Sequence, residues 1–358
     1  MFEDFKVQSF HHEYHVKFCE YKSELAKNLL EGDFIILDKN IKNIYQDVDK
    51  VIKGHKVYLV DPSEEAKSYE NIGNIINLII ESGFSKNNRL VAIGGGITQD
   101  ITSFIASILL RGVGWIFVPT NLATQCDSCI GSKNTVNAGN FKNQLGGFHP
   151  PENIIIDYKF CDSLADREIA SGLGEMMHYF LVDGVSNLDE LHEDILKAKT
   201  DKQTLAKLVN RSLSIKAPMV ELDEFDKGPR NVFNFGHSFG HALESATDYA
   251  VPHGVAVAYG MDLANLISAH LGLIDIELRN SINPLLQSIW EDISIPEFEI
   301  DRFFSALSKD KKNIGNEVKV ILTRGLGDMF KTTLPMTNDV KTLINNFFKD
   351  KLYYEQTW

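Results

Sequence analysis

Short apolar runs alternate with amphipathic stretches through the first half of the chain, and this alternation limits the possible folds most strongly. Five runs have the length and apolar character of buried strands: Phe34–Leu37, Val57–Val60, Leu90–Gly96, Trp115–Pro119 and Ile154–Asp157. Two stretches between these runs, Glu64–Glu81 and Ile97–Leu110, have apolar residues at helical spacing. Strands that alternate with helices need crossover connections, so the pattern predicts a mostly parallel sheet.

The second half has mainly helical spacing. Helices are expected over Ala165–Asp183, Asn187–Lys197, Gln203–Met219, Asn231–Thr247 and Gly254–Leu271, with one strand at Val318–Leu322. A chain of 358 residues is long enough for about two domains. We therefore expect an α/β fold, with a nucleotide-type domain over residues 1–160 and a mostly α-helical domain over 161–358. A ligand is expected in the cleft between them.

Charge and composition exclude several classes of protein. The chain has 36 Lys and Arg against 49 Asp and Glu, a net charge of −13, which argues against binding to nucleic acid or to an anionic membrane. No signal peptide pattern and no membrane-length apolar run is found. Four cysteines in so long a chain indicate a reducing compartment. We expect a soluble cytoplasmic protein.

Three segments are harder to interpret. Residues 121–151 are rich in Asn, Gly, Ser and Lys with little periodicity, so we expect a long functional loop. Cys126 and Cys129 form one C-x-x-C, which favours small core residues over a redox or zinc site. The histidines of HHEYH, near the N-terminus, are more typical of a surface strand than of a metal site.

A glycine-rich segment, GGGITQD, lies between an expected strand and an expected helix. Backbone without Cβ atoms can approach a pyrophosphate closely, and a helix N-terminus supplies free N–H groups. The segment is either a phosphate or dinucleotide loop or a plain tight turn. Asp38, at the end of the first strand, is either a ribose ligand or a turn residue.

Three histidines lie close together in the second half. His237 and His241 are four residues apart and share one helix face, and His253 follows. Neutral imidazole is a good zinc ligand, usually with a carboxylate, and Glu175 in an otherwise apolar helix is the best candidate. The alternative is a set of hydrogen-bonded core histidines. Spacing alone leaves open which two of the three would bind a metal.

Basic residues gather near the same segments. Each alone is more typical of a solvated surface, but several cations near one metal indicate a phosphorylated substrate, with or without a carboxylate. The set consists of Arg111, Lys133, Lys142, Lys216, Arg230, Lys311 and Lys312.

Together these stretches resemble the 3-dehydroquinate synthase family and, more broadly, the sugar phosphate cyclases. The matching segments are GGGITQD, LLRGVGWIFVPTNL, DSCIGSKNTVN, FKNQLGGFHPP, REIASGLGE, KGPRNVFNFGHSFGHALE, HGVAVAYGM and DKKNIG. The resemblance implies a Rossmann-like NAD-binding domain and one divalent metal, Zn or Co. It implies cyclisation of a phosphorylated heptulosonate with loss of phosphate, most simply 3-deoxy-arabino-heptulosonate 7-phosphate to 3-dehydroquinate.

The resemblance also implies roles for particular residues. The metal ligands carry over as Glu175, His237 and His253. Phosphate contacts carry over as His241, Lys133, Asn143 and Lys311, carboxylate contacts as Lys216 and Arg230, and hydroxyl contacts as Asp127 and Asn234. Arg111 resembles an arginine that reaches a neighbouring subunit's phosphate pocket, which implies a homodimer. The NAD contacts would be Asp38, Glu64, Lys67, Gly94, Gly95, Gly96, Asp100, Thr120 and Lys142.

Some positions depart from the family pattern. His178 stands where a substrate-binding lysine is expected, and Val255 replaces an acidic residue. Gln99, Asn121 and Ser132 are further differences. These changes keep three alternatives open: a cyclase for an amino analogue or sedoheptulose 7-phosphate, a metal-dependent NAD alcohol dehydrogenase, and a non-catalytic homologue.

Overall fold

The computed structural model describes residues 3–139, 141–308 and 317–354. The chain divides into two compact units. The first unit comprises Met1–Leu164 and Lys216–Lys227, and the second comprises Ala165–Ile215 and Gly228–Trp358. The domain boundary expected between residues 160 and 161 stays a prediction.

A seven-stranded sheet forms the centre of the first unit, with strand order β1-β2-β9-β6-β5-β3-β4. Only the β1–β2 pair is antiparallel. The strands of this sheet are β1 (Phe5–Gln8), β2 (Glu13–Phe18), β3 (Phe34–Asp38), β4 (Lys56–Val60), β5 (Leu90–Gly94), β6 (Trp115–Pro119) and β9 (Asn153–Ile156). β3, β5 and β6 are buried along their whole length, as their unbroken apolar sequences require.

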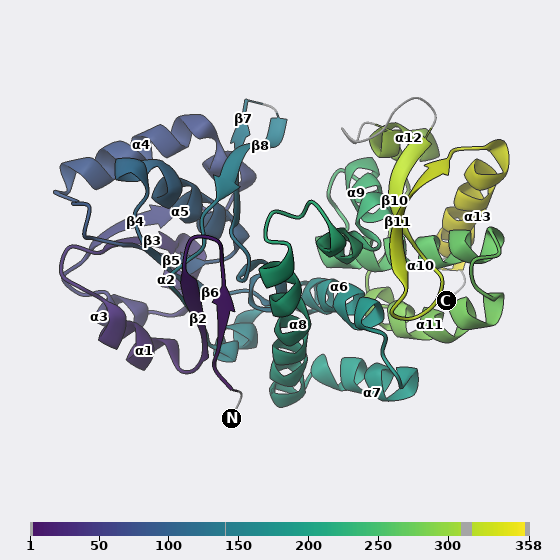
Figure 1. The fold of residues 1–358 in the computed structure, drawn as a ribbon, viewed down its shortest axis with the longest axis horizontal. Helices are drawn as coiled ribbons and strands as arrows, with labels where there is room; N and C mark the ends of the chain where they lie inside the picture. Colours follow the sequence, from purple (N-terminus) through teal and green to yellow (C-terminus); the bar gives the residue numbers. More distant parts are fainter. Residues whose placement is uncertain (1–2, 140, 309–316, 355–358) are drawn as a thin grey trace. The chain divides into compact units, whose positions relative to one another are not determined.

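Helices cover both faces of this sheet (Figure 1). Those of the first unit are α1 (Tyr21–Asn28), α2 (Lys39–Ile44), α3 (Val48–Val51), α4 (Tyr69–Glu81) and α5 (Gly96–Ile108). Ile35 and Leu37 of β3 pack with Val91 and Ile93 of β5 against α1–α3. The expected α/β fold with a parallel, Rossmann-like sheet is confirmed.

The segment 121–151 is not the long loop that its composition predicted. It contains a π-helical turn, η3 (Thr124–Ser128), and a two-stranded sheet of β7 (Lys133–Ala138) and β8 (Phe141–Phe148). Side-chain amides support this sheet: Asn134 Oδ1 accepts from Gly147 N at 3.0 Å, and Asn137 Oδ1 accepts from Asn143 N at 2.9 Å. Since β8 is exposed along most of its length, it has no apolar alternation that could have revealed it.

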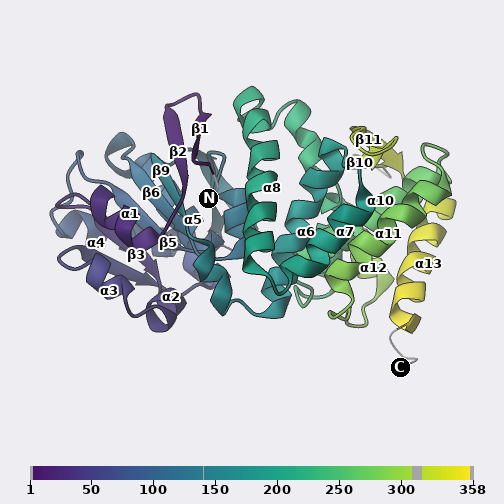
Figure 2. The same cartoon turned by 90° about the horizontal axis from the view of Figure 1, so that it is seen from below.

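The second unit is mostly helical (Figure 2). Its helices are α6 (Asp166–Asp183), α7 (Leu188–Ala198), the first part of α8 (Lys202–Leu222), α9 (His237–Ala246), α10 (His253–His270), α11 (Ile276–Trp290), α12 (Ile300–Ser308) and α13 (Asn338–Tyr354). β10 (Glu317–Thr323) was expected, and its antiparallel partner β11 (Met329–Pro335) was not. No helix among the described residues is long and apolar enough to cross a membrane.

The prediction of a single helix over Asn231–Thr247 is wrong. The chain forms a short 3₁₀ helix, η5 (Pro229–Asn234), and then α9, with Gly236 between them at φ 82°. A Cβ at Gly236 would lie 2.6 Å from Val257 O in α10, so glycine is required both by the backbone conformation and by the close approach. The break therefore makes His237 the first residue of α9.

Helices α6 and α10 cross at two glycines. A Cβ at Gly174 would lie 2.1 Å from Gly254 O, and a Cβ at Gly254 would lie 1.8 Å from Ser171 O. Backbone meets backbone here, so no side-chain movement could relieve a larger residue. The crossing brings Glu175 and His253, the neighbours of these glycines, into the same region.

We predict that Gly254→Ala destabilises the protein by about 2 kcal/mol or more, because overpacking at a backbone contact forces the helices apart. Thermal unfolding followed by circular dichroism measures the effect. Gly73→Ala in α4 is the matched control, since nothing lies within 4 Å of a Cβ there. That change should stabilise the protein by about 0.5–1 kcal/mol. Equal melting temperatures for the two variants would contradict the crossing.

Candidate active site

In the first unit, several expected nucleotide contacts meet at the carboxyl edge of the sheet. Asp38 ends β3, Gly94 ends β5, and Thr120, directly after β6, donates its N–H to Gly94 O at 3.1 Å. Asp38 also caps α2 by accepting from Asn40 N at 2.7 Å, and burial raises the pKa of its carboxyl. The carboxyl edge of a parallel sheet is the usual ligand position in such folds.

The glycine segment leads directly into α5. Cβ atoms at Gly94 and Gly95 would lie 2.4 Å from Thr98 Oγ1 and 2.5 Å from Asn121 Nδ2, whereas at Gly96 the nearest atom would be 4.0 Å away. The turn is therefore tight on one side and open at the first residue of the helix. Gly95, the N-cap, has no side chain to satisfy the first N–H groups of α5. These groups suit an anionic ligand.

A second cluster joins residues expected to contact NAD with one expected to contact phosphate. Lys67 Nζ lies 2.6 Å from Asp100 Oδ2 and 2.7 Å from Asn143 Oδ1. Burial raises the pKa of Asp100, although Lys67 and the Thr135 N–H act in the opposite direction. Glu64 Oε1 accepts from Asn137 Nδ2 at 2.7 Å.

Two other candidates lie on exposed parts of the first unit. Lys142 belongs to the exposed strand β8. Arg111 is exposed and has φ 64°, directly after Leu110 at φ 49°. Lys86 Nζ donates to Leu110 O at 2.8 Å and so holds this unusual turn. The proposed contact of Arg111 with a neighbouring subunit stays a prediction.

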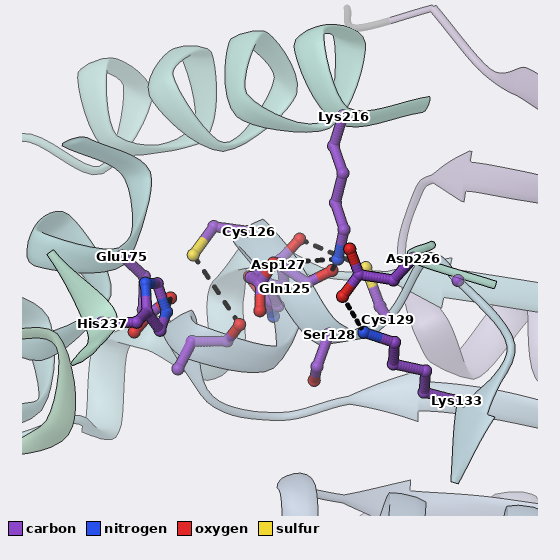
Figure 3. Close-up of polar contacts among 12 residues, drawn as sticks. Gln125, Cys126, Asp127, Ser128, Cys129, Lys133, Glu175, Lys216, Asp226 and His237 are labelled. Carbon is purple, nitrogen blue, oxygen red and sulfur yellow. Dashed lines mark hydrogen bonds and ion pairs between the residues drawn. The ribbon is translucent and has the colours of Figure 1, made fainter. Parts of the chain in front are cut away.

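Two of the expected substrate cations are each held by an aspartate of the same unit (Figure 3). Lys216 Nζ, from α8, lies 2.8 Å from Asp127 Oδ1 and 2.6 Å from Asp127 O. Lys133 Nζ lies 2.5 Å from Asp226 Oδ2. The sequence indicated Lys133, Lys216 and Asp127 but not Asp226, whose pairing depends on the loop that follows α8.

The three expected metal ligands come together in the second unit. Glu175 Oε1 lies 2.9 Å from His253 Nε2, and Glu175 Oε2 lies 3.8 Å from His237 Nε2. Their ligand atoms all lie within 4.8 Å of one another. A carboxylate with two imidazoles is a donor set of catalytic zinc sites, so these residues fit a divalent metal.

The two histidines differ in the pKa of their imidazole rings. Burial lowers the pKa of His237 to about 3, so its imidazole is neutral at ordinary pH, as a metal ligand must be. Burial acts on His253 in the same direction, but the carboxylates of Glu175 and Glu244 outweigh it and raise its pKa well above the ordinary value. Glu244 was not among the residues expected from the sequence.

Other candidates of the second unit surround these ligands. The His241 ring stacks on the His253 ring with centroids 5.4 Å apart, and the buried His178 ring lies 5.1 Å from that of His237. Arg230 and Asn234 belong to η5, where Arg230 is buried and Asn234 Nδ2 donates to Asn231 O at 3.1 Å. Lys311 lies outside the described residues.

A small polar cavity adjoins these residues. It has a volume of about 80 Å³, and it is lined by Asn234, His237 and His241, and by Lys319 and Lys331 of the β10–β11 sheet. Lys331 Nζ donates to Asn231 Oδ1. Neither lysine was expected from the sequence: Lys331 lies on β11, which was not expected, and Lys319 lies on β10, whose position beside α9 has no local signal. This volume is several times the space that one water molecule needs.

Solved structures share this arrangement of a parallel-sheet unit followed by a helical unit. The fold matches 2-deoxy-scyllo-inosose synthase complexed with carbaglucose-6-phosphate, NAD⁺ and Co²⁺, with a TM-score of 0.86, 23% identity and coverage of 98% of this chain and 100% of that one. It also matches a 2-epi-5-epi-valiolone synthase from Streptomyces hygroscopicus with NAD⁺ and Zn²⁺ bound, with a TM-score of 0.80, 22% identity and coverage of 94% and 97%. The chain thus has the fold of these two synthases.

Sequence comparison is more specific. Residues 57–171 match the model of the 3-dehydroquinate synthase N-terminal domain, and residues 172–313 match that of the C-terminal domain. The 3-dehydroquinate synthase of Alkaliphilus metalliredigens is 33% identical over 317 residues, which cover 87% of this chain and 89% of that protein. That of Acidithiobacillus ferrooxidans is 36% identical over 301 residues, 82% of each chain. The chain belongs to the 3-dehydroquinate synthase family, as the sequence motifs indicated.

We predict that Glu175→Gln weakens binding of Zn²⁺ or Co²⁺ by about 100-fold or more, since even loss of a residue that only supports a ligand can reach that size. Competition with a coloured chelator measures the affinity. Asp166→Asn, an exposed position of the same helix, is the control and should bind like the wild type. Unchanged affinity in Glu175→Gln would exclude the proposed ligand set.

Proposed function

We propose that this protein is an NAD- and metal-dependent cyclase that converts 3-deoxy-arabino-heptulosonate 7-phosphate to 3-dehydroquinate with loss of phosphate. The observation that carries the proposal is the convergence of Glu175, His237 and His253 in a chain that matches both domains of the 3-dehydroquinate synthase family. The cytoplasm would be the place of the reaction.

NAD and a divalent metal would supply a reversible hydride acceptor and a Lewis acid for one substrate alcohol. Glu175, His237 and His253 would hold the metal. The two structural relatives, which contain NAD⁺ with Co²⁺ or Zn²⁺, support a divalent metal without deciding between them. For NAD, the support is the open glycine turn at α5 and the residues Asp38, Gly94 and Thr120 at the carboxyl edge of the sheet. Glu64, Lys67, Asp100 and Lys142 would be further contacts.

The substrate's two anionic groups would be bound by different cations. Lys216 and Arg230 are buried, which suits a charge-assisted contact with a carboxylate. The Asp127 carboxylate would accept hydrogen bonds from ring hydroxyls, and the Asn234 amide would donate hydrogen bonds to them or accept hydrogen bonds from them. Lys133, Asn143, His241 and Lys311 would bind phosphate, and the cavity beside His241 suggests Lys319 and Lys331 as additional contacts. Because these contacts would hold the phosphate group in position, the group would not have to diffuse across the site before it leaves.

A homodimer is part of the proposal. The exposed Arg111, on its strained turn, would reach the phosphate group bound by the neighbouring subunit. The energetic cost of two consecutive left-handed residues is easier to understand if the turn has such a function.

Purified protein with NAD, Zn²⁺ or Co²⁺ and 3-deoxy-arabino-heptulosonate 7-phosphate should release one phosphate per product without net formation of NADH. Phosphate, absorbance at the NADH band and product mass are measured together. Steady accumulation of NADH would instead identify an alcohol dehydrogenase. Turnover of sedoheptulose 7-phosphate or an amino analogue alone would contradict the assigned substrate.

A related cyclase of altered specificity is the second candidate, and His178 favours it. This buried imidazole packs against Tyr179, with ring centroids 3.9 Å apart, and beside the proposed metal ligand His237. The lysine expected by family resemblance carries an ammonium with three donors, whereas an imidazole offers at most two N–H groups. The difference would change how a substrate hydroxyl is recognised.

We predict that His178→Lys raises kcat/KM for 3-deoxy-arabino-heptulosonate 7-phosphate by about tenfold, the value of one added hydrogen bond to a charged group. Steady-state phosphate release measures it. His178→Met is the control, because it keeps a long side chain without the charge. A lower or unchanged rate in His178→Lys, with normal folding, would remove this position from substrate selection.

A further inference from the structure

His253 lies between two carboxylates. Its Nε2 is 2.9 Å from Glu175 Oε1, and its Nδ1 is 3.0 Å from Glu244 Oε2. A neutral imidazole has one N–H and one lone pair. If Nε2 directs its lone pair to a metal shared with Glu175, then Nδ1 must carry the hydrogen and donate it to Glu244.

The backbone fixes Glu244 in this position. Glu244 lies seven residues after His237, two turns along the same face of α9, and its side chain is 12% exposed. Tyr249 N donates to Glu244 O at 2.7 Å and so ties the end of α9 to the turn that leads to α10. His253 is the first residue of α10. One helix therefore carries both a proposed ligand and the partner of another.

Close helix packing restricts the pair further. A Cβ at Gly240 of α9 would lie 2.9 Å from Val257 Cα, and a Cβ at Gly260 of α10 would lie 2.0 Å from Gly236 O. α9 and α10 can approach this closely only because these residues are glycines. The contact leaves little freedom for the distance between Glu244 and His253 to change.

A second arrangement of ligands competes with this interpretation. The ligand atoms of His241, Glu244 and His253 also lie within 4.8 Å of one another. In that arrangement Glu244 would bind a metal directly. Burial favours the first set: the Glu175 side chain is 4% exposed, and a buried carboxylate needs a cationic partner more than the less buried Glu244 does.

We propose that Glu244 is a positioning residue, which holds His253 as the Nδ1–H tautomer and orients its Nε2 toward the metal. The proposal rests on the metal site of the proposed function. A carboxylate behind a ligating histidine also increases the basicity of the ring and hence the strength of the bond to the metal. Glu244 itself would touch neither metal nor substrate.

The test measures metal affinity rather than turnover. Apo protein is titrated with Zn²⁺ or Co²⁺ against a chelator, for wild type, Glu244→Gln and Glu244→Ala. We expect affinity to fall about 10–100-fold, with the alanine variant weaker than the glutamine variant. The visible spectrum of bound Co²⁺ should keep the wild-type band pattern, because the ligand atoms are unchanged. Thermal melts confirm that both variants are folded.

His241→Asn separates the two interpretations. It removes a member of the second ligand set but leaves Glu175, His237 and His253, so metal affinity should stay within about twofold of wild type. Weakening equal to that of the Glu244 variants, or a changed Co²⁺ spectrum in Glu244→Gln, would overturn the proposal in favour of direct ligation.

The remaining outcomes are also decisive. Wild-type affinity in both Glu244 variants would show that the hydrogen bond has no effect on the metal, while the cyclase assignment would stand. Failure of the wild-type protein to bind Zn²⁺ or Co²⁺ at all would overturn both the role of Glu244 and the metal-dependent function.

Discussion

The buried carboxylate of Glu175 is the group on which the second unit's site depends. A negative charge in the interior is costly unless cationic or hydrogen-bonding partners surround it. α6 supplies the charge, while His237 and His253 stand at the first positions of α9 and α10. The glycine contacts of α10 with α6 and with α9 hold the three side chains within reach of one another. The packing of these helices therefore sets the positions of the three side chains that would bind a metal.

Features with a short sequence period could be predicted from the chain alone. The buried runs that became β3, β5 and β6 need only local apolar character, and α10 appeared with its helical spacing. Asp38 and the glycines were proposed as nucleotide contacts because a strand end followed by a helix start is a common position for such a ligand. The separate roles of His237, His241 and His253 came from family motifs, since spacing alone could not distinguish them.

Other features depend on contacts between distant segments and left little local signal. The β7–β8 sheet is built from polar residues on an exposed ribbon. The sequence across the break before α9 has helical spacing, and only the close contact of Gly236 with α10 explains the break. Asp226 was missed because its partner, Lys133, is far away in the chain. Glu244 did have a signal, because its position seven residues after His237 places both on one helix face.

If Lys133 binds the substrate phosphate as proposed, its pairing with Asp226 has a consequence for selectivity. An incoming anion would then compete with the Asp226 carboxylate for this cation. Such an exchange discriminates by charge density, because a singly charged ion such as chloride gains little over the carboxylate that it displaces. A dianionic phosphate ester gains much more. Small cellular anions would thus be screened out by competition inside the protein itself, without any steric filter.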